Sequence, residues 1–161
     1  MYLLLLTIAM CLAYVVLYFL FSFFFKNKFT PITGKSFISI FLIIIVSFIA
    51  YTASFGVADP ELGNRIMHMF GGGFLAFMVC FLVVKDSKLA INKFQFFIFS
   101  FLIVIALGVA NEIAEFFLQN FAYLRFSSSI NDTWLDLISN VIGALIAAVC
   151  FVPFLKRNTK I

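Results

Sequence analysis

Long apolar runs, separated by short polar segments, make up most of this chain. Five of the runs are long enough to cross a hydrocarbon core about 30 Å thick as helices, which rise about 1.5 Å per residue. The fourth run is long for a spanning helix, so its end is expected to tilt or to project. The pattern predicts an all-α polytopic membrane bundle that forms a single transmembrane domain over residues 1–161, with helices at about 2–25, 37–57, 64–84, 94–119 and 131–155.

Composition agrees with this prediction. Hydrophobic residues make up 65% of the chain, charged residues 11%, and the mean hydropathy is +1.17, as is typical of integral membrane proteins. The formal net charge of +4 does not indicate nucleic acid as a partner, because the chain has no basic face with interleaved aromatic residues. Cys11, Cys80 and Cys150 lie in apolar runs without a Cys-x-x-Cys pair, so packing is their expected role.

The charged residues predict the orientation of the bundle. Nine of the eleven lysines and arginines fall in the first loop, the third loop and the C-terminal tail, which lie on one side of a five-span bundle. The positive-inside rule makes that side cytoplasmic, so the N-terminus is expected outside and the C-terminus inside. Among the seven carboxylates, only Asp86 falls on the lysine side. We expect a multi-pass protein of the cell membrane, in bacteria the cytoplasmic membrane.

Polar residues recur at helical spacing near the outer ends of the last three runs. Charge inside a membrane span is costly and usually marks function. Each polar stripe continues into small residues, such as Gly72, Gly108 and Gly143, which let membrane helices approach closely. The three helices should therefore bring their polar groups together. The predicted polar pocket contains Arg65, His68, Glu112, Glu115, Asp132, Asp136 and Asn140, with Asn111 and Arg125 as further candidates.

Some of these residues have structural explanations as well. Arg65 and Arg125 either join the cluster or pair with Asp59 or Glu61 as interface anchors. Asp132 either belongs to the pocket or only favours the positive end of a helix dipole.

A metal site is one chemical interpretation of the same residues. Glu112 and Glu115 lie one helical turn apart, and His68 and Asp136 would complete a site for a hard cation or zinc. The alternative for His68 is proton transfer or a structural hydrogen bond to Glu112 or Asp136. The Glu-x-x-Glu pattern alone is a weak signal for a metal. A divalent metal ion is therefore only a candidate cofactor, and the sequence indicates no other cofactor.

The outer side carries an excess of negative charge. Its six carboxylates and two arginines sum to a formal −4. Four carboxylates close together in low-dielectric surroundings cannot all stay ionised without cations. We therefore expect protonation, pairing with Arg65 or His68, or metal binding, and the excess suits a cationic ligand, a divalent ion or proton-linked behaviour.

Three segments of the chain resemble the VanZ-like membrane proteins. They match an Asp-Lys-x-x-His segment, a Glu-containing helix and a final Asp-x-x-x-Asn-x-x-Gly-Ala helix, in that order. In this chain the segments are Asn64–His68 with Gly71–Gly73, Glu112–Phe116 with Gln119, and Asn131–Asp136 with Asn140 and Gly143-Ala144. Asn64 departs from the usual Asp, and no clear Gly-Arg follows the Glu helix. The chain is also similar to YjdF-like inner-membrane proteins, which have paired acids and an Asp-Thr-x-x-Asp entry to the last helix.

Three functional classes follow. The resemblance implies a bacterial cell-envelope protein, linked to glycopeptide antibiotic resistance, whose outer-leaflet pocket engages a membrane lipid, a cell-wall precursor or an amphiphilic antibiotic. The second class is an intramembrane hydrolase or transferase acting on a lipid headgroup, with Glu112 or Glu115 as general base and His68 and Arg65 stabilising an anion. The third is a small ion- or proton-coupled transporter, which would need a homo-oligomer because five helices enclose little volume.

Overall fold

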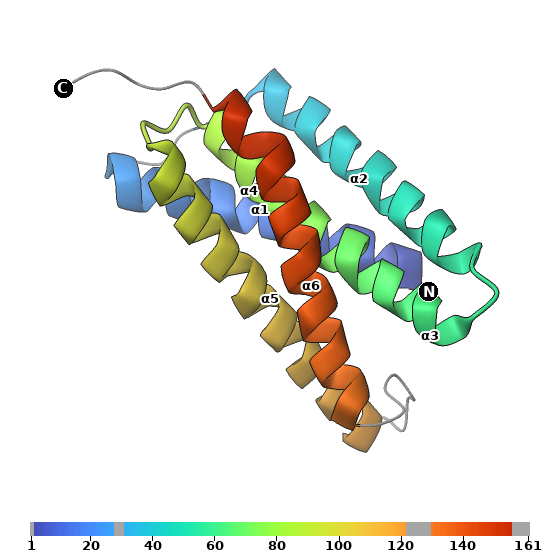
Figure 1. Ribbon diagram of the computed structural model, residues 1–161. Coiled ribbons are helices and arrows are strands. Elements are labelled where there is room, and N and C mark those ends of the chain that lie inside the picture. Colours follow the sequence, from blue (N-terminus) through green and yellow to red (C-terminus); the bar gives the residue numbers. More distant parts are fainter. Residues whose placement is uncertain (1, 28–30, 122–129, 156–161) are drawn as a thin grey trace.

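The computed structural model describes residues 2–27, 31–121 and 130–155, and these form helices and short connections without a strand (Figure 1). Among these residues, five stretches are long and apolar enough to cross a membrane, which confirms the predicted all-α bundle. The elements are α1 (Tyr2–Lys26), α2 (Gly34–Phe55), α3 (Pro60–Ile66), the π-helix η1 (Met67–Phe74), α4 (Leu75–Asp86), α5 (Lys93–Phe121), α6 (Ile130–Phe151) and the 3-10 turn η2 (Val152–Phe154).

The third span is built from α3, η1 and α4, and it begins at Pro60 rather than near residue 64. The side chain of Asp59 accepts the backbone N–H of Glu61 at 3.0 Å, which satisfies one of the unpaired donors at the helix start. Pro60 occupies the first turn, where its missing N–H costs nothing. This segment therefore caps the helix and also supplies its first residues.

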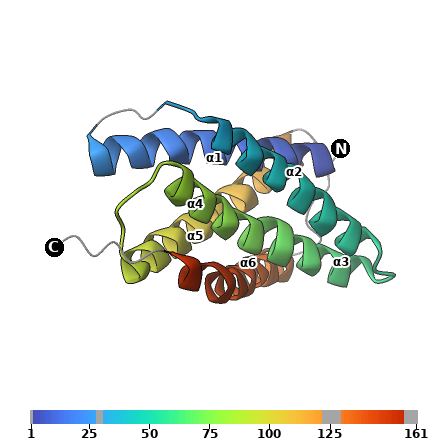
Figure 2. The ribbon, with the colours of Figure 1, turned by 90° about the horizontal axis from the view of Figure 1, so that it is seen from above.

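This third span lies at the centre of the bundle. Figure 2 shows α4 between α1 and α2 on one side and α6 on the other. In the most apolar 18-residue stretch of the third span, 61% of the residues are buried. In the corresponding stretches of the other four spans, 11–33% are buried. Every residue from Leu75 to Val84 is buried, so α4 is enclosed on all sides and needs no polar face.

A π-helix interrupts the third span where the sequence pattern predicts a regular α-helix. In η1 each turn is wider than in an α-helix, and Gly71–Gly73 leave bare backbone on it. A Cβ added to Gly73 would overlap the carbonyl oxygen of Asn140, and one added to Gly143 would overlap that of Met69. The predicted close approach of small residues is thus confirmed between η1 and α6, at backbone-to-backbone distance.

The two ends of the bundle differ in charge. The lysine-rich end holds Lys26, Lys35, Lys85, Lys88 and Lys93, and the carboxylate-rich end holds Asp59, Glu61, Glu112, Glu115, Asp132 and Asp136. This separation agrees with the predicted alternation of the spans. The side of the membrane that each end faces stays a prediction.

One carboxylate, Asp86, joins three helices at the lysine-rich end. The Tyr14 hydroxyl of α1 donates to Asp86 Oδ2 at 2.7 Å, and the Ser39 hydroxyl of α2 donates to the same oxygen at 2.5 Å. The Lys26 ammonium also donates to the carbonyl oxygen of Ser87. The buried carboxylate of Asp86 is tolerated because Oδ2 accepts the hydrogen bonds from Tyr14 and Ser39. Through these two bonds, Asp86 ties α1 and α2 to α4.

Candidate functional site

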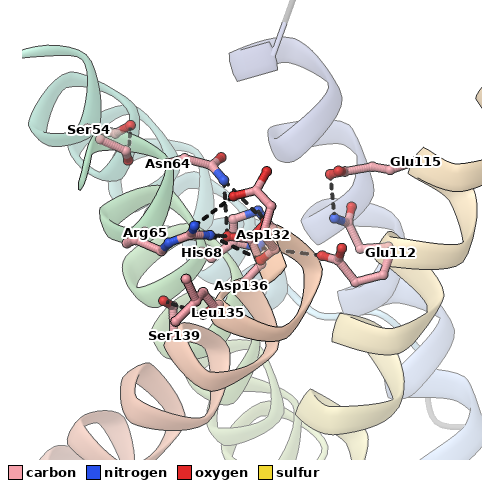
Figure 3. Close-up of polar contacts among 12 residues, drawn as sticks. Ser54, Asn64, Arg65, His68, Glu112, Glu115, Asp132, Leu135, Asp136 and Ser139 are labelled. Atoms are coloured by element: carbon pink, nitrogen blue, oxygen red, sulfur yellow. Dashed lines mark hydrogen bonds and ion pairs between the residues drawn. The ribbon is translucent and has the colours of Figure 1, made fainter. Parts of the chain in front are cut away.

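Arg65, near the end of α3, lies between two aspartates of α6 (Figure 3). Its Nη2 is 2.7 Å from Asp132 Oδ1 and its Nη1 is 2.5 Å from Asp136 Oδ1. Nη1 also donates to the backbone carbonyl oxygen of Asp132 at 3.1 Å. Two open alternatives are thereby decided: Arg65 joins the cluster rather than pairing with Asp59 or Glu61, and Asp132 does more than start a helix.

Asp136 is the most buried member of the cluster, with 1% of its surface exposed. Besides Arg65, it accepts hydrogen bonds from Asn64 Nδ2 at 3.0 Å on Oδ1 and 3.2 Å on Oδ2. His68 Nε2 lies 3.4 Å from Asp136 Oδ2. A carboxylate so deeply buried is stable only when charge and hydrogen bonds surround it. The predicted pocket omitted Asn64, although its spacing of four residues from His68 places both on one helix face.

His68 connects this group to α5. Its Nδ1 lies 4.0 Å from Glu112 Oε1, and the two residues are buried, with exposures of 9% and 8%. Figure 3 shows Glu112 pointing from α5 toward His68, opposite the Arg65 side of the cluster. In the described part of the chain, Glu112 Oε1 and Asn140 Oδ1 are buried oxygens with no hydrogen-bond donor.

Glu115 and Asn111 extend the cluster along α5. Asn111 Nδ2 donates to Glu115 Oε1 at 2.8 Å, so Asn111 joins through Glu115. One ligand atom from each of His68, Glu112 and Glu115 lies within 4.8 Å of the others. Asp136, which helical spacing also makes a candidate metal ligand, is not in this group, because Arg65 and Asn64 hold it on the other side of the imidazole.

Glycines make room for Asn140 at the same level. A Cβ on Gly72 of η1 would overlap Asn140 Oδ1, and one on Gly108 of α5 would lie 3.0 Å from Asn140 Nδ2. The amide of Asn140 is therefore enclosed between η1 and α5. Gly72 and Gly108 are the residues expected to allow close approach, and the group that approaches them is a polar side chain.

A cavity of about 450 Å³ opens beside the cluster. Its polar end is formed by Asn64, His68, Asn111, Glu115 and Asn140, and its walls come mainly from apolar residues of α1 and α5. Arg65, Asp132, Asp136 and Glu112 are not among the lining residues. The site therefore has two parts, an ion-paired part away from the cavity and an acceptor-rich part next to it, with His68 in contact with both.

The structure thus brings together the seven residues of the predicted polar pocket and Asn111. Arg125, the remaining candidate, lies outside the described residues. Four carboxylates and one guanidinium leave the cluster with excess negative charge, as expected. Arg65 pairs with both aspartates but offsets only one of their two negative charges. Glu112 and Glu115 depend on His68, on protonation or on a further cation.

The fold and the cluster define a polytopic helical membrane protein with a buried polar site. The chain belongs to the predicted membrane protein family DUF2238, whose sequence model matches residues 3–157. Neither a curated protein nor a solved structure matches it. The family match supports the membrane location and the transmembrane helices. It assigns no ligand or reaction, and it does not name the VanZ-like or YjdF-like proteins.

Proposed function

We propose that this protein binds an amphiphile of the outer leaflet, with the apolar chain in the cavity between α1 and α5 and the headgroup at the polar end. The observation that carries this proposal is the lining of the cavity. Ligand sites are typically concave and mostly apolar, with a few polar groups that orient the ligand. Here the polar groups all come from the cluster, and the apolar residues cover the remaining wall.

Part of the cavity wall is exposed. Leu5 and Ala9 of α1 and Ala110 and Leu118 of α5 line the cavity, and all four are exposed on the surface of the bundle. Leu5 is 50% exposed and Leu118 is 40% exposed. An acyl or isoprenoid chain can therefore enter sideways from the lipid, and the headgroup need not cross the hydrocarbon core.

Membrane lipids, lipid-linked cell-wall precursors and amphiphilic antibiotics share the required chemistry, an apolar chain attached to a polar headgroup. The resemblance to VanZ-like proteins favours the latter two. The positive-inside rule supports a location of the pocket at the outer leaflet of a bacterial cytoplasmic membrane.

The contacts of Arg65 favour binding over catalysis. An intramembrane hydrolase or transferase would use Arg65 to stabilise a developing anion. Both terminal nitrogens of Arg65 are instead engaged by Asp132 and Asp136, and the guanidinium does not line the cavity. A role for Arg65 in holding the helices together fits these contacts better.

Native mass spectrometry of the purified full chain tests the proposal. We expect a bound amphiphile that is displaced when Ala9→Phe fills the cavity, while Ala53→Phe on the exposed face of α2 leaves binding intact. Adding a phospholipid, an undecaprenyl-linked precursor or teicoplanin in separate arms distinguishes the three sources. Equal binding by the Ala9→Phe and Ala53→Phe variants would show that the cavity is not the binding site.

A further inference from the structure

The geometry points to a metal site at the junction of η1 and α5: we infer that His68, Glu112 and Glu115 bind a divalent transition-metal ion, with Zn²⁺ as the preferred ion. This inference goes beyond amphiphile binding and does not require it. One imidazole nitrogen and two carboxylates form a donor set suited to Zn²⁺, whereas Ca²⁺ and Mg²⁺ prefer oxygen ligands alone.

The distances fit donors that share one ion. Zn²⁺ binds nitrogen and oxygen donors at about 2.0–2.2 Å, so two donors on the same ion lie about 3.4 Å apart in a tetrahedral site. His68 Nδ1 and Glu112 Oε1 are 4.0 Å apart, too far for a hydrogen bond. One ligand atom of Glu115 completes a group in which all separations are within 4.8 Å. Small side-chain rotations would bring the three donors to bonding distance.

A buried, unpartnered oxygen gives independent support. Glu112 is 8% exposed, and among the described residues its Oε1 has no hydrogen-bond donor. A carboxylate oxygen buried in this way loses its hydration and gains no hydrogen bond in return. Since Oε1 is the atom that faces His68 Nδ1, an ion between the two would supply the missing partner.

The surroundings of the ligands follow the pattern of known metal sites. A metal-bound histidine usually directs its other ring nitrogen to a carboxylate, which selects the tautomer and orients the ring. His68 Nε2 lies 3.4 Å from Asp136 Oδ2, and Asp136 is itself held by Arg65 and Asn64. Asn111 orients Glu115 by donating to its Oε1 at 2.8 Å. The imidazole and Glu115 thus each have a supporting group outside the ligand set.

Charge and access agree with an ion at this position. With a neutral imidazole, Glu112 and Glu115 carry two negative charges that a divalent ion balances, whereas Arg65 is occupied by the aspartates of α6. His68 and Glu115 line the cavity, so an ion bound to them has a coordination position open to it. Water or the headgroup of a bound amphiphile would fill that position.

Metal analysis of the purified full chain, free of any histidine tag, tests this inference. After removal of metals with a chelator, we expect the wild-type chain to take up one Zn²⁺ ion, which also raises its unfolding temperature. Glu112→Gln should weaken Zn²⁺ binding by more than the roughly 10- to 100-fold expected for loss of a supporting residue. The control is Glu61→Gln, which removes an exposed carboxylate at the same end of the bundle and should change neither quantity.

A spectroscopic measurement and a second variant test whether His68 and the two glutamates are the ligands. Co²⁺ bound in place of Zn²⁺ should give visible absorption bands that change in the His68→Asn variant. If Glu112→Gln does not fold, Glu115→Gln serves instead, because Glu115 is only half-buried. A folded Glu115→Gln or Glu112→Gln chain that binds Zn²⁺ as tightly as the wild type would overturn the inference, and so would a wild-type chain that binds none.

The metal site and the amphiphile site can fail separately. Ala9→Phe should abolish amphiphile binding and leave one Zn²⁺ ion per chain, because Ala9 lines the cavity wall and provides no ligand atom. Zn²⁺ uptake without any bound amphiphile would refute only the proposed function. A bound amphiphile on a chain that takes up no metal would refute only the metal site.

Discussion

Arg65 Nη1 lies 2.5 Å from Asp136 Oδ1 across 71 positions of the chain, and this contact joins the third span to α6. The aspartate is buried, while 20% of the arginine side chain is exposed. Removing one partner of such a pair leaves an uncompensated charge in surroundings of low dielectric constant. The consequences for stability can be measured directly.

Arg65→Leu should destabilise the bundle by about 3–5 kcal/mol, because Asp132 and Asp136 lose their counter-charge. The double variant Arg65→Leu, Asp136→Leu should recover part of that loss, since one unpaired carboxylate is removed with the arginine. Unfolding free energies in detergent measure both effects. Lys85→Leu, an exposed position at the lysine-rich end, is the control. Strictly additive losses would contradict the coupling of Arg65 with Asp136.

Gly143→Ala should destabilise the chain by about 1–3 kcal/mol or more, because the added methyl group meets backbone and not a movable side chain. The new Cβ would overlap the carbonyl oxygen of Met69 and lie 2.9 Å from the backbone nitrogen of Phe74. Gly34→Ala is a matched control, because a Cβ at Gly34 meets nothing within 4 Å. The melting temperature in detergent compares the two. An equal effect of both substitutions would show that η1 and α6 do not pack this closely.

Tyr14→Phe should destabilise the lysine-rich end by about 1–3 kcal/mol, because Asp86 loses a hydrogen bond in a buried position. The effect should appear as faster hydrogen exchange or proteolysis near the middle of α1 and the end of α4. Tyr51→Phe, which keeps its ring stacked on Phe55, is the control and should be nearly neutral. Unchanged protection in Tyr14→Phe would show that Asp86 does not tie α1 to α4.

Asp59→Ala should cost about 0.5–2 kcal/mol, because the start of α3 loses the side chain that caps it. Asp59→Asn should recover most of this, since an amide oxygen can accept the same backbone N–H from Glu61. Circular dichroism during thermal unfolding measures the difference. If alanine and asparagine behave alike, the hydrogen bond to Glu61 contributes little.

The predicted orientation can be tested by labelling single cysteines in intact bacteria. In a chain from which Cys11, Cys80 and Cys150 have been removed, Glu61→Cys should react with a membrane-impermeant maleimide. Lys88→Cys should react only after the cells are opened, because the positive-inside rule places the lysine-rich end in the cytoplasm. The reverse pattern of labelling would invert the topology and place the cavity at the inner leaflet.

The features that were predictable depend on one segment of the chain and its surroundings. The five spans were predictable because a helix that crosses lipid must satisfy its own backbone hydrogen bonds and be apolar over about 20 residues. Helical spacing predicted the seven pocket residues that the structure brings together, but it missed Asn64. Asp followed by Pro is a local helix-start signal, yet the predicted bound near residue 64 missed the start of the third span at Pro60.

The choice of partners within the cluster depended on tertiary structure. The sequence leaves Arg65 six possible acidic partners, which are Asp59, Glu61 and the four carboxylates of the predicted pocket. Only the rotation of α6 against α3 selects Asp132 and Asp136. Asn64 and Asp86 acquired their roles in the same way, through residues of other helices.

By itself, the sequence determined the number of spans, their approximate bounds and the level at which polar groups collect, because each depends on one segment and its solvent. Only the tertiary structure decided the π-helix at Met67–Phe74, the enclosure of Asn140 and the position of His68 between Asp136 and Glu112. These features arise where the backbones of neighbouring helices come into contact. Such contacts depend on the rotation and depth of several helices at once.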